Sequence, residues 1–450
     1  MSLAFSVRTN RTLRSNGDVL EATDIVDSPV PKGSSARAEK QPSRRTLRGL
    51  DWVNFFLSDV QSGVGPFLAI YLAGLKWNEA QVGLALTIGG IAGIVTQAPA
   101  GELADRLRSK RALIAGGVVG LAAGAGLIAF LPKFWTVILA QVLIGGTSSI
   151  FIPAVCAISL GVVGRAAFDA RQGRNQGFNS AGNVAAALSM GLLAYSISNR
   201  SIFFFVMGCA APTFLSLLLI NPGEIDYQAA RGGGGEETAS VMSLLDDRPL
   251  VIFLSCAVMF HFANAAMLPL LGQMLAKGHG RSSMMFMSAC VVTTQTVITF
   301  LAPWAGRSAA AWGRKRLLLI AFGALPVRAV LYTLTANPYA LVAIQILDGV
   351  GAGIFGVISV LVIADLTKGT GRFNLSLGSV SAAVGIGASL SQVIAGAIVH
   401  AFGYNAGFLF LGAIAAGAFG LLFFYMPETA SMTRDPDSIE ETKHHAPYQD

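Results

Sequence analysis

The sequence predicts an all-α polytopic membrane protein with twelve transmembrane helices in two six-helix halves. Three observations support this class. Apolar residues make up 53% of the 450 residues and charged residues only 13%, whereas about a quarter of the residues of a soluble protein are charged. The apolar residues gather in runs long enough to cross a hydrocarbon core, which needs roughly 20 helical residues. Segments of the first half of the chain also recur in the second half.

The apolar runs set the expected boundaries. Residues 1–49 are rich in Ser, Arg, Asp and Pro, cannot bury enough surface to fold, and are expected to form a disordered cytoplasmic tail. The first six-helix bundle is expected at 50–220, a cytoplasmic linker at 221–248, the second bundle at 249–426, and a second cytoplasmic tail at 427–450. The expected spans are 50–73, 80–104, 111–131, 134–160, 176–197, 201–220, 249–275, 282–306, 315–335, 338–365, 373–400 and 404–426.

Charges in the loops predict the orientation. Lys and Arg favour cytoplasmic loops, and a cytoplasmic N-terminus places most of them inside. The outer loops then contain only Lys76, Lys133, Arg200, Lys277 and Arg281. We therefore expect a multi-pass protein of the inner cell membrane with both termini in the cytoplasm. The net charge of +7 is explained by these short loops, so the lipid bilayer is the expected partner and nucleic acid is not.

An internal repeat relates the two halves. The segment Gln141–Gly145 (Gln-Val-Leu-Ile-Gly) matches Gln345–Gly349 (Gln-Ile-Leu-Asp-Gly), at a spacing of 204 positions (345 − 141 = 204). Ala98-Pro99 and Ala302-Pro303 keep the same spacing. An even number of spans separates the copies, so both halves have the same orientation, and such halves can rock about a shared cavity near the membrane midplane.

A charged turn after the second span carries the clearest motif. It reads Gly-Glu-Leu-Ala-Asp-Arg-Leu-Arg-Ser-Lys-Arg over residues 101–111, and a weaker copy occupies 306–316. Together with twelve spans and a linker after the sixth, this turn resembles motif A of the major facilitator superfamily. Two positions depart from the family pattern: Arg108 stands where Gly is usual, and Ala310 replaces the Asp of the second copy.

The resemblance implies the fold of that superfamily and a gate on the cytoplasmic side. In the family, the Asp of motif A contacts the opposite half. Here Asp105 is expected to face Arg372 and the positive end of the eleventh span. The expected gate residues are Gly101, Asp105, Arg106, Lys110, Arg111 and Arg372.

Charged side chains inside the spans are functional candidates, because each costs several kcal/mol in the bilayer unless it is paired or faces water. Asp59 lies near the midplane of the first span and is a candidate for binding a proton or a cationic substrate group. His261, near Asn264, occupies the matching position of the seventh span and could exchange protons with Asp59, although a structural histidine is the favoured interpretation. Arg328 and Asp348 lie at one depth on neighbouring spans and are expected to form a structural ion pair.

Uncharged polar residues within the spans, among them Gln141 and Gln345, either line a transport cavity or join helices. The four cysteines show no repeated spacing, so no disulfide framework and no metal site are expected, and no cofactor is expected either.

The sequence therefore predicts a monomeric secondary transporter, not an enzyme, that exports a drug-like or amphipathic small molecule with proton coupling. The alternatives are proton-coupled uptake of a small metabolite and, from another class, a membrane-embedded sensor or enzyme. Gln141 leaves coupling open, because proton-coupled family members often have Arg in that stretch.

Overall fold

The structure is a computed structural model that describes residues 42–62, 64–107, 109–227, 247–368 and 373–429. Most of the two expected tails and of the expected linker lies outside these residues. The described residues belong to one compact unit that includes both halves. The described residues form helices and no β-strand, as expected for this fold class.

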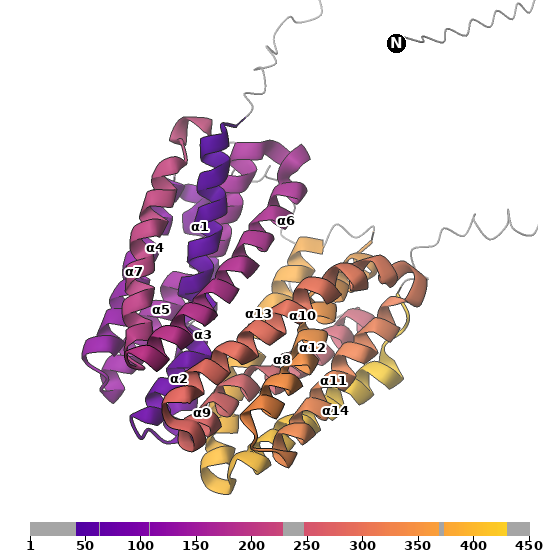
Figure 1. Ribbon diagram of the computed structural model, residues 1–450. Coiled ribbons are helices and arrows are strands. Elements are labelled where there is room, and N and C mark those ends of the chain that lie inside the picture. Colours follow the sequence, from indigo (N-terminus) through magenta and orange to yellow (C-terminus); the bar gives the residue numbers. More distant parts are fainter. Residues whose placement is uncertain (1–41, 63, 108, 228–246, 369–372, 430–450) are drawn as a thin grey trace, which may run out of the picture. The chain divides into compact units, whose positions relative to one another are not determined.

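Seven helices build the first half of the chain (Figure 1). They are α1 (Arg44–Ser62), α2 (Val64–Gly74), α3 (Glu79–Arg106), α4 (Lys110–Phe130), α5 (Phe134–Ser148), α6 (Phe151–Ser196) and α7 (Ser201–Leu219), followed by the short 3₁₀ helix η1 (Pro222–Glu224). We call the membrane end at which α1 begins the Arg44 side, and the end at which α3 begins the Glu79 side.

The second half repeats this pattern of long helices (Figure 1). Its helices are α8 (Arg248–Ala265), α9 (Met267–His279), η4 (Gly280–Ser282), α10 (Ser283–Trp312), α11 (Arg314–Leu334), α12 (Pro338–Leu366), α13 (Phe373–Phe402) and α14 (Tyr404–Tyr425). Nine helical stretches of the described chain are long and apolar enough to cross a membrane, and one of them, Arg248–Trp312, covers both the seventh and the eighth expected spans. The expected twelve spans are consistent with this arrangement.

Several helix boundaries differ from the expected ones. The fourth expected span, 134–160, is divided between α5, which ends at Ser148, and α6, which begins at Phe151. α1 begins at Arg44 rather than at residue 50, because the Ser43 hydroxyl accepts the Thr46 amide at 3.2 Å and the Ser43 amide donates to Glu224 at 2.9 Å. α6 continues through the expected loop at 161–175 and is interrupted only at Gly164, whose φ of 69° suits glycine.

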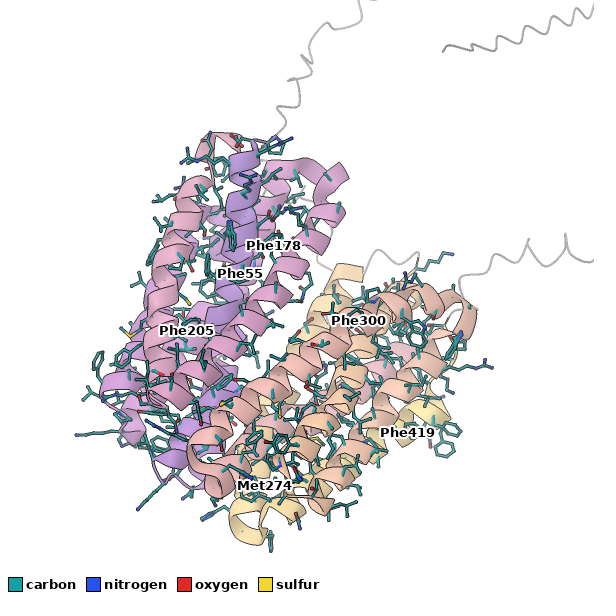
Figure 2. All side chains as sticks on the ribbon, in the orientation of Figure 1. Phe55, Phe178, Phe205, Met274, Phe300 and Phe419 are labelled. Carbon is teal, nitrogen blue, oxygen red and sulfur yellow. The ribbon has the colours of Figure 1, made fainter. Side chains whose placement is uncertain are left out.

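Large apolar side chains on the outer surface fit a lipid environment. Phe300 on α10 is 76% exposed (Figure 2), and Trp135 on α5 is 78% exposed. In water such exposure would be unfavourable, whereas lipid chains solvate it without cost. The surface of the helices therefore agrees with the multi-pass assignment.

Small residues allow close packing within and between the halves. A Cβ atom on Gly145 of α5 would meet the carbonyl group of Gly89 on α3, so these two backbones touch. Between the halves, α3 packs on α13, where a Cβ on Gly83 would meet the carbonyl of Gln392. The Thr87 hydroxyl donates to the Ser389 carbonyl at 2.7 Å across the same contact.

Candidate transport site and gates

A buried ion pair joins two helices of the second half. Arg328 on α11 donates to Asp348 on α12, and the Arg328 side chain has no exposed surface while 11% of the Asp348 side chain is exposed. Thr294 on α10 donates to the other carboxylate oxygen of Asp348 at 3.1 Å. Arg328 also donates to the Asn264 side chain on α8 at 2.6 Å. This single charge pair therefore holds four helices together.

Two further residues complete this Arg328 cluster. The Tyr332 hydroxyl accepts a hydrogen bond from Arg328 at 2.9 Å and another from the Gln345 amide. Within the described residues, the Arg328 Nη2 atom and the Gln345 Oε1 atom are buried without a hydrogen-bond partner. Buried polar atoms normally have partners, so Arg328 Nη2 could donate one further hydrogen bond and Gln345 Oε1 could accept one.

The matching positions of the first half have different chemistry. At the spacing of 204 positions, Arg328 corresponds to Gly124 and Asp348 to Ile144. A Cβ on Gly124 would lie 2.6 Å from the Ile144 side chain, so these two residues form an apolar contact between α4 and α5. Gln141, the counterpart of Gln345, is buried and donates to the Ala85 carbonyl at 3.3 Å, while its Oε1 atom has no partner among the described residues.

His261 lies among aromatic rings. Its ring centroid is 4.9 Å from that of Phe355 on α12 and 5.4 Å from that of Phe260, both in edge-to-face geometry. No hydrogen bond joins His261 to another residue that the structure describes. Asp59 belongs to α1, but its side chain lies outside the description, so proximity of Asp59 to His261 stays a prediction.

The charged turn between α3 and α4 is described in part. Arg106 forms an exposed ion pair with Glu102, one helical turn earlier. Lys110 is buried and donates to the Ala104 carbonyl, and Gly101 has open space where a Cβ would be. The Arg111 Nε atom is buried without a partner in the described part of the chain. The Asp105 side chain and the whole of Arg372 lie outside the described residues, so the expected contact between them stays a prediction.

A carboxylate on the Glu79 side collects polar groups from the opposite half, and the sequence reasoning missed it. Glu79 at the start of α3 forms an ion pair with Lys277 at the end of α9. Its carboxylate also accepts the Tyr404 hydroxyl of α14 at 3.1 Å and lies 3.6 Å from His400 Nδ1 on α13. We call these four residues the Glu79 cluster. Only 8% of the Glu79 side chain is exposed.

A local signal marks the start of α3 but not these partners. Asn78 accepts the Gln81 amide, and the Gln81 side chain accepts the Asn78 amide, which is a capping box. This cap fixes the first turn of α3 and thereby the direction of the Glu79 side chain. The partners lie about two hundred or more positions later in the chain, where no local pattern points to them.

A second missed carboxylate lies on the Arg44 side. Asp51 on α1 binds Arg171 and Arg174 of α6, each at 2.7 Å, and Arg171 also donates to Asn175 at 2.8 Å. The hydrogen bond to Asp51 raises the pKa of Arg174, whereas burial lowers the pKa of Arg171. Asp51 therefore ties α6 to α1 through both guanidinium groups.

Comparison with known proteins identifies the family. Residues 51–297 and 253–447 match the family model described as Major Facilitator Superfamily. The chain belongs to the major facilitator superfamily. It is 45% identical over 392 residues to the uncharacterized MFS-type transporter Rv2456c of Mycobacterium tuberculosis (strain ATCC 25618 / H37Rv), an alignment that covers 86% of this chain and 94% of the relative. The uncharacterized MFS-type transporter MT2531 of Mycobacterium tuberculosis (strain CDC 1551 / Oshkosh) matches with the same values.

Solved structures of two other transporters share the fold at low sequence identity. The crystal structure of the nucleoside transporter NupG has a TM-score of 0.71 and 15% identity, and the match covers 84% of this chain and 98% of that one. A POT family transporter in complex with a thioalcohol conjugated peptide has a TM-score of 0.70 and 12% identity, over 87% of this chain and 97% of that one.

Membership of the superfamily makes this chain a membrane transporter for a small molecule and not an enzyme. Three groups of charged side chains, around Arg328, Glu79 and Asp51, join helices of the described chain. Among the described residues, no group of three or more His, Cys, Asp or Glu side chains is arranged to hold a metal ion.

Proposed function

We propose that this superfamily member is a secondary active transporter that works by alternating access and exports a drug-like or amphipathic solute with proton coupling. The observation that supports alternating access is the Glu79 cluster, which joins the first half to three helices of the second half. Such a cluster can close one side of a central path when it forms and open that side when it breaks.

The other bonds between the halves lie at the same end of the membrane. The Thr87 hydroxyl bonds to Ser389 about 12 Å along α3 from Glu79, at 1.5 Å per residue. Ser288 on α10 donates to the Ala187 carbonyl on α6, and Arg281 donates to the Ile197 carbonyl at 2.7 Å. Within the described residues, no hydrogen bond or ion pair joins the halves on the Arg44 side. This distribution favours a state closed on the Glu79 side.

The loop charges favour a cytoplasmic Arg44 side. With this orientation, the Glu79 cluster is the outer gate, and Asp105 with Arg372 would form the inner one. Asp59 is the proposed coupling carboxylate, with His261 as the second candidate. The Arg328 cluster then serves as a rigid unit of the second half, and the unpaired oxygens of Gln141 and Gln345 are candidates for polar contacts with the solute.

Opening of the proposed outer gate can be measured by labelling. In a variant that lacks the four native cysteines, Ser389→Cys places a thiol at the buried contact with Thr87. Glu79→Gln removes the charge that holds Lys277, so we expect a membrane-impermeant maleimide added outside to label Cys at position 389 several times faster. Glu102→Gln is the matched control, because its carboxylate lies on the same helix but pairs within it. Equal labelling in all three proteins would refute the gate.

Direction and coupling need a transport assay. Purified protein is reconstituted into vesicles with and without a pH gradient, with ethidium as an amphipathic cation and labelled uridine as a polar metabolite. Ethidium movement against its gradient that depends on the pH gradient supports proton-coupled export. Accumulation of uridine instead would favour the uptake alternative, which is suggested by the nucleoside transporter of the same fold.

A further inference from the structure

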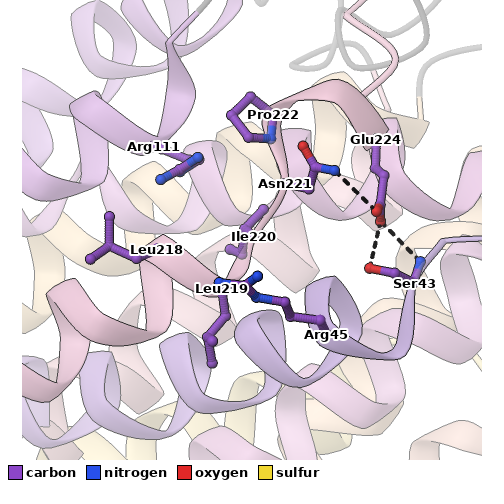
Figure 3. A pocket seen from close by; sticks show the side chains of 9 residues that line it. All are labelled: Ser43, Arg45, Arg111, Leu218, Leu219, Ile220, Asn221, Pro222 and Glu224. Carbon is purple, nitrogen blue, oxygen red and sulfur yellow. Dashed lines mark hydrogen bonds between the residues drawn. The ribbon is translucent and has the colours of Figure 1, made fainter.

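Two adjoining cavities open on the Arg44 side, between the first turn of α1, the start of α4 and the end of α7. The smaller has a volume of about 230 Å³ and is shown in Figure 3. The larger has a volume of about 440 Å³. Arg111, Leu218 and Pro222 line both of them, so the two cavities adjoin, and we call them together the recess.

The recess is positively charged. Arg45 of α1 and Arg111 of α4 line the smaller cavity, and Lys110 lines the larger one. Neither Arg45 nor Arg111 has an ionic partner among the described residues, and the buried Arg111 Nε atom lacks any hydrogen-bond partner there. A guanidinium group without a partner is costly to bury and offers donors in the fork geometry that suits a phosphate group.

One carboxylate lies in the recess, and it already accepts hydrogen bonds from neighbouring residues of the protein. Glu224 accepts the Ser43 amide at 2.9 Å and the Ser43 hydroxyl at 3.0 Å with one oxygen, and the Asn221 amide at 3.3 Å with the other (Figure 3). Burial alone would raise the pKa of Glu224, but these hydrogen bonds lower it, so the group stays charged. Its bonds hold it to the start of α1, and three cations line the recess against this one anion.

The recess continues into an apolar surface. Phe214, Leu217 and Leu218 of α7 line the larger cavity. Leu218 is 63% exposed and Leu215, on the neighbouring turn, is 64% exposed. Because the chain spans a membrane, this surface is in contact with lipid chains. A ligand at this site therefore meets cations at one end and hydrocarbon at the other.

We propose that this recess binds an anionic phospholipid, with its phosphate group between Arg45 and Arg111 and an acyl chain along α7. The charge selects a lipid with net negative charge, because a zwitterionic headgroup carries a cation that the three basic residues repel. The recess shares Lys110 and Arg111 with the expected cytoplasmic gate, so its test measures lipid binding directly and not transport. It does not depend on which solute is transported.

The test is lipid binding by the purified full chain in detergent, measured by native mass spectrometry with added phosphatidylglycerol or phosphatidylcholine. We expect retained phosphatidylglycerol and little phosphatidylcholine. Arg45→Gln/Arg111→Gln should weaken phosphatidylglycerol binding at least tenfold, which corresponds to about 1.4 kcal/mol. Arg45→Lys/Arg111→Lys keeps both charges and should retain most of the binding, and Arg45→Gln alone, on an exposed side chain, reports the effect if the double variant does not fold.

Arg44→Gln/Arg48→Gln is the matched control. It removes the same number of positive charges, both from α1, but these side chains line a different cavity, beside Asp51. We expect less than a twofold change. An equal loss in both double variants would reduce the effect to general attraction and overturn the site, as would equal binding of the two lipids. Inorganic phosphate that displaces phosphatidylglycerol at millimolar concentration would show a site for free phosphate and overturn the lipid assignment.

Discussion

The Arg328–Asp348 pair should behave as one energetic unit. Exposed ion pairs contribute at most about 1 kcal/mol, but the Arg328 side chain has no exposed surface. Breaking a buried pair by removing one partner costs about 3–5 kcal/mol, because a charge is left uncompensated. In Asp348→Asn, Arg328 keeps its bonds to Asn264 and Tyr332, so we expect a loss near the lower end, about 3 kcal/mol. That value lowers the ratio of folded to unfolded protein by roughly 150-fold.

The assay is a double-mutant cycle with unfolding in mixed micelles at increasing dodecyl sulfate. Asp348→Asn and Arg328→Gln are each measured, and Arg328→Gln/Asp348→Asn should recover at least about 1 kcal/mol of the summed loss, within the range found for residues in contact. Thr294→Val is the control, because it removes only a neutral donor to Asp348 and should cost about 1 kcal/mol. Additive single losses, or single losses no larger than that of the control, would refute the reasoning.

Three further predictions concern transport and packing. Asp59→Asn should abolish solute accumulation driven by a pH gradient while counterflow remains; uphill transport at the normal rate in vesicles would show that Asp59 is structural. Asp105→Asn should leave expression intact and shift accessibility toward the state open to the cytoplasm, which unchanged cysteine labelling from both sides would contradict. Gly145→Ala places a Cβ against the Gly89 carbonyl and should lower the yield of folded protein severalfold. Gly146→Ala meets only Thr96 at 3.6 Å and serves as its control; equal yields would mean that the helices can separate at no cost.

The sequence predicted most helix ends because the bilayer imposes them. The expected span 111–131 corresponds to α4 (Lys110–Phe130), because a membrane-spanning segment usually ends where a charged residue occurs. The depth of Arg328 and Asp348 followed from their distance to one short turn. The depth of a residue in the membrane follows from the number of helical residues between it and the turn, and this number was sufficient to place Arg328 beside Asp348.

The rotation of each helix about its axis could not be predicted, so the side-chain partners of Asn264 and Glu79 could not be predicted either. Asn264 was named only for its place near His261, yet its side chain accepts from Arg328 on another helix. Glu79 lies one residue before the expected span 80–104, and its partners come from α9, α13 and α14. Contacts between distant segments depend on how the halves pack, and a single sequence contains no signal for that packing.

The repeat gives this protein an internal reference for its buried charges. Where the second half holds Arg328 against Asp348, the first half holds Gly124 against Ile144 at the matching positions of the same fold. Equivalent positions of the two halves therefore hold an apolar contact in one half and an ion pair in the other, within a single polypeptide. Arg328→Gly/Asp348→Ile places the residues of the first half at these positions and tests whether the ion pair only stabilises the fold. A variant that folds well but transports poorly would show that the charges take part in the transport cycle.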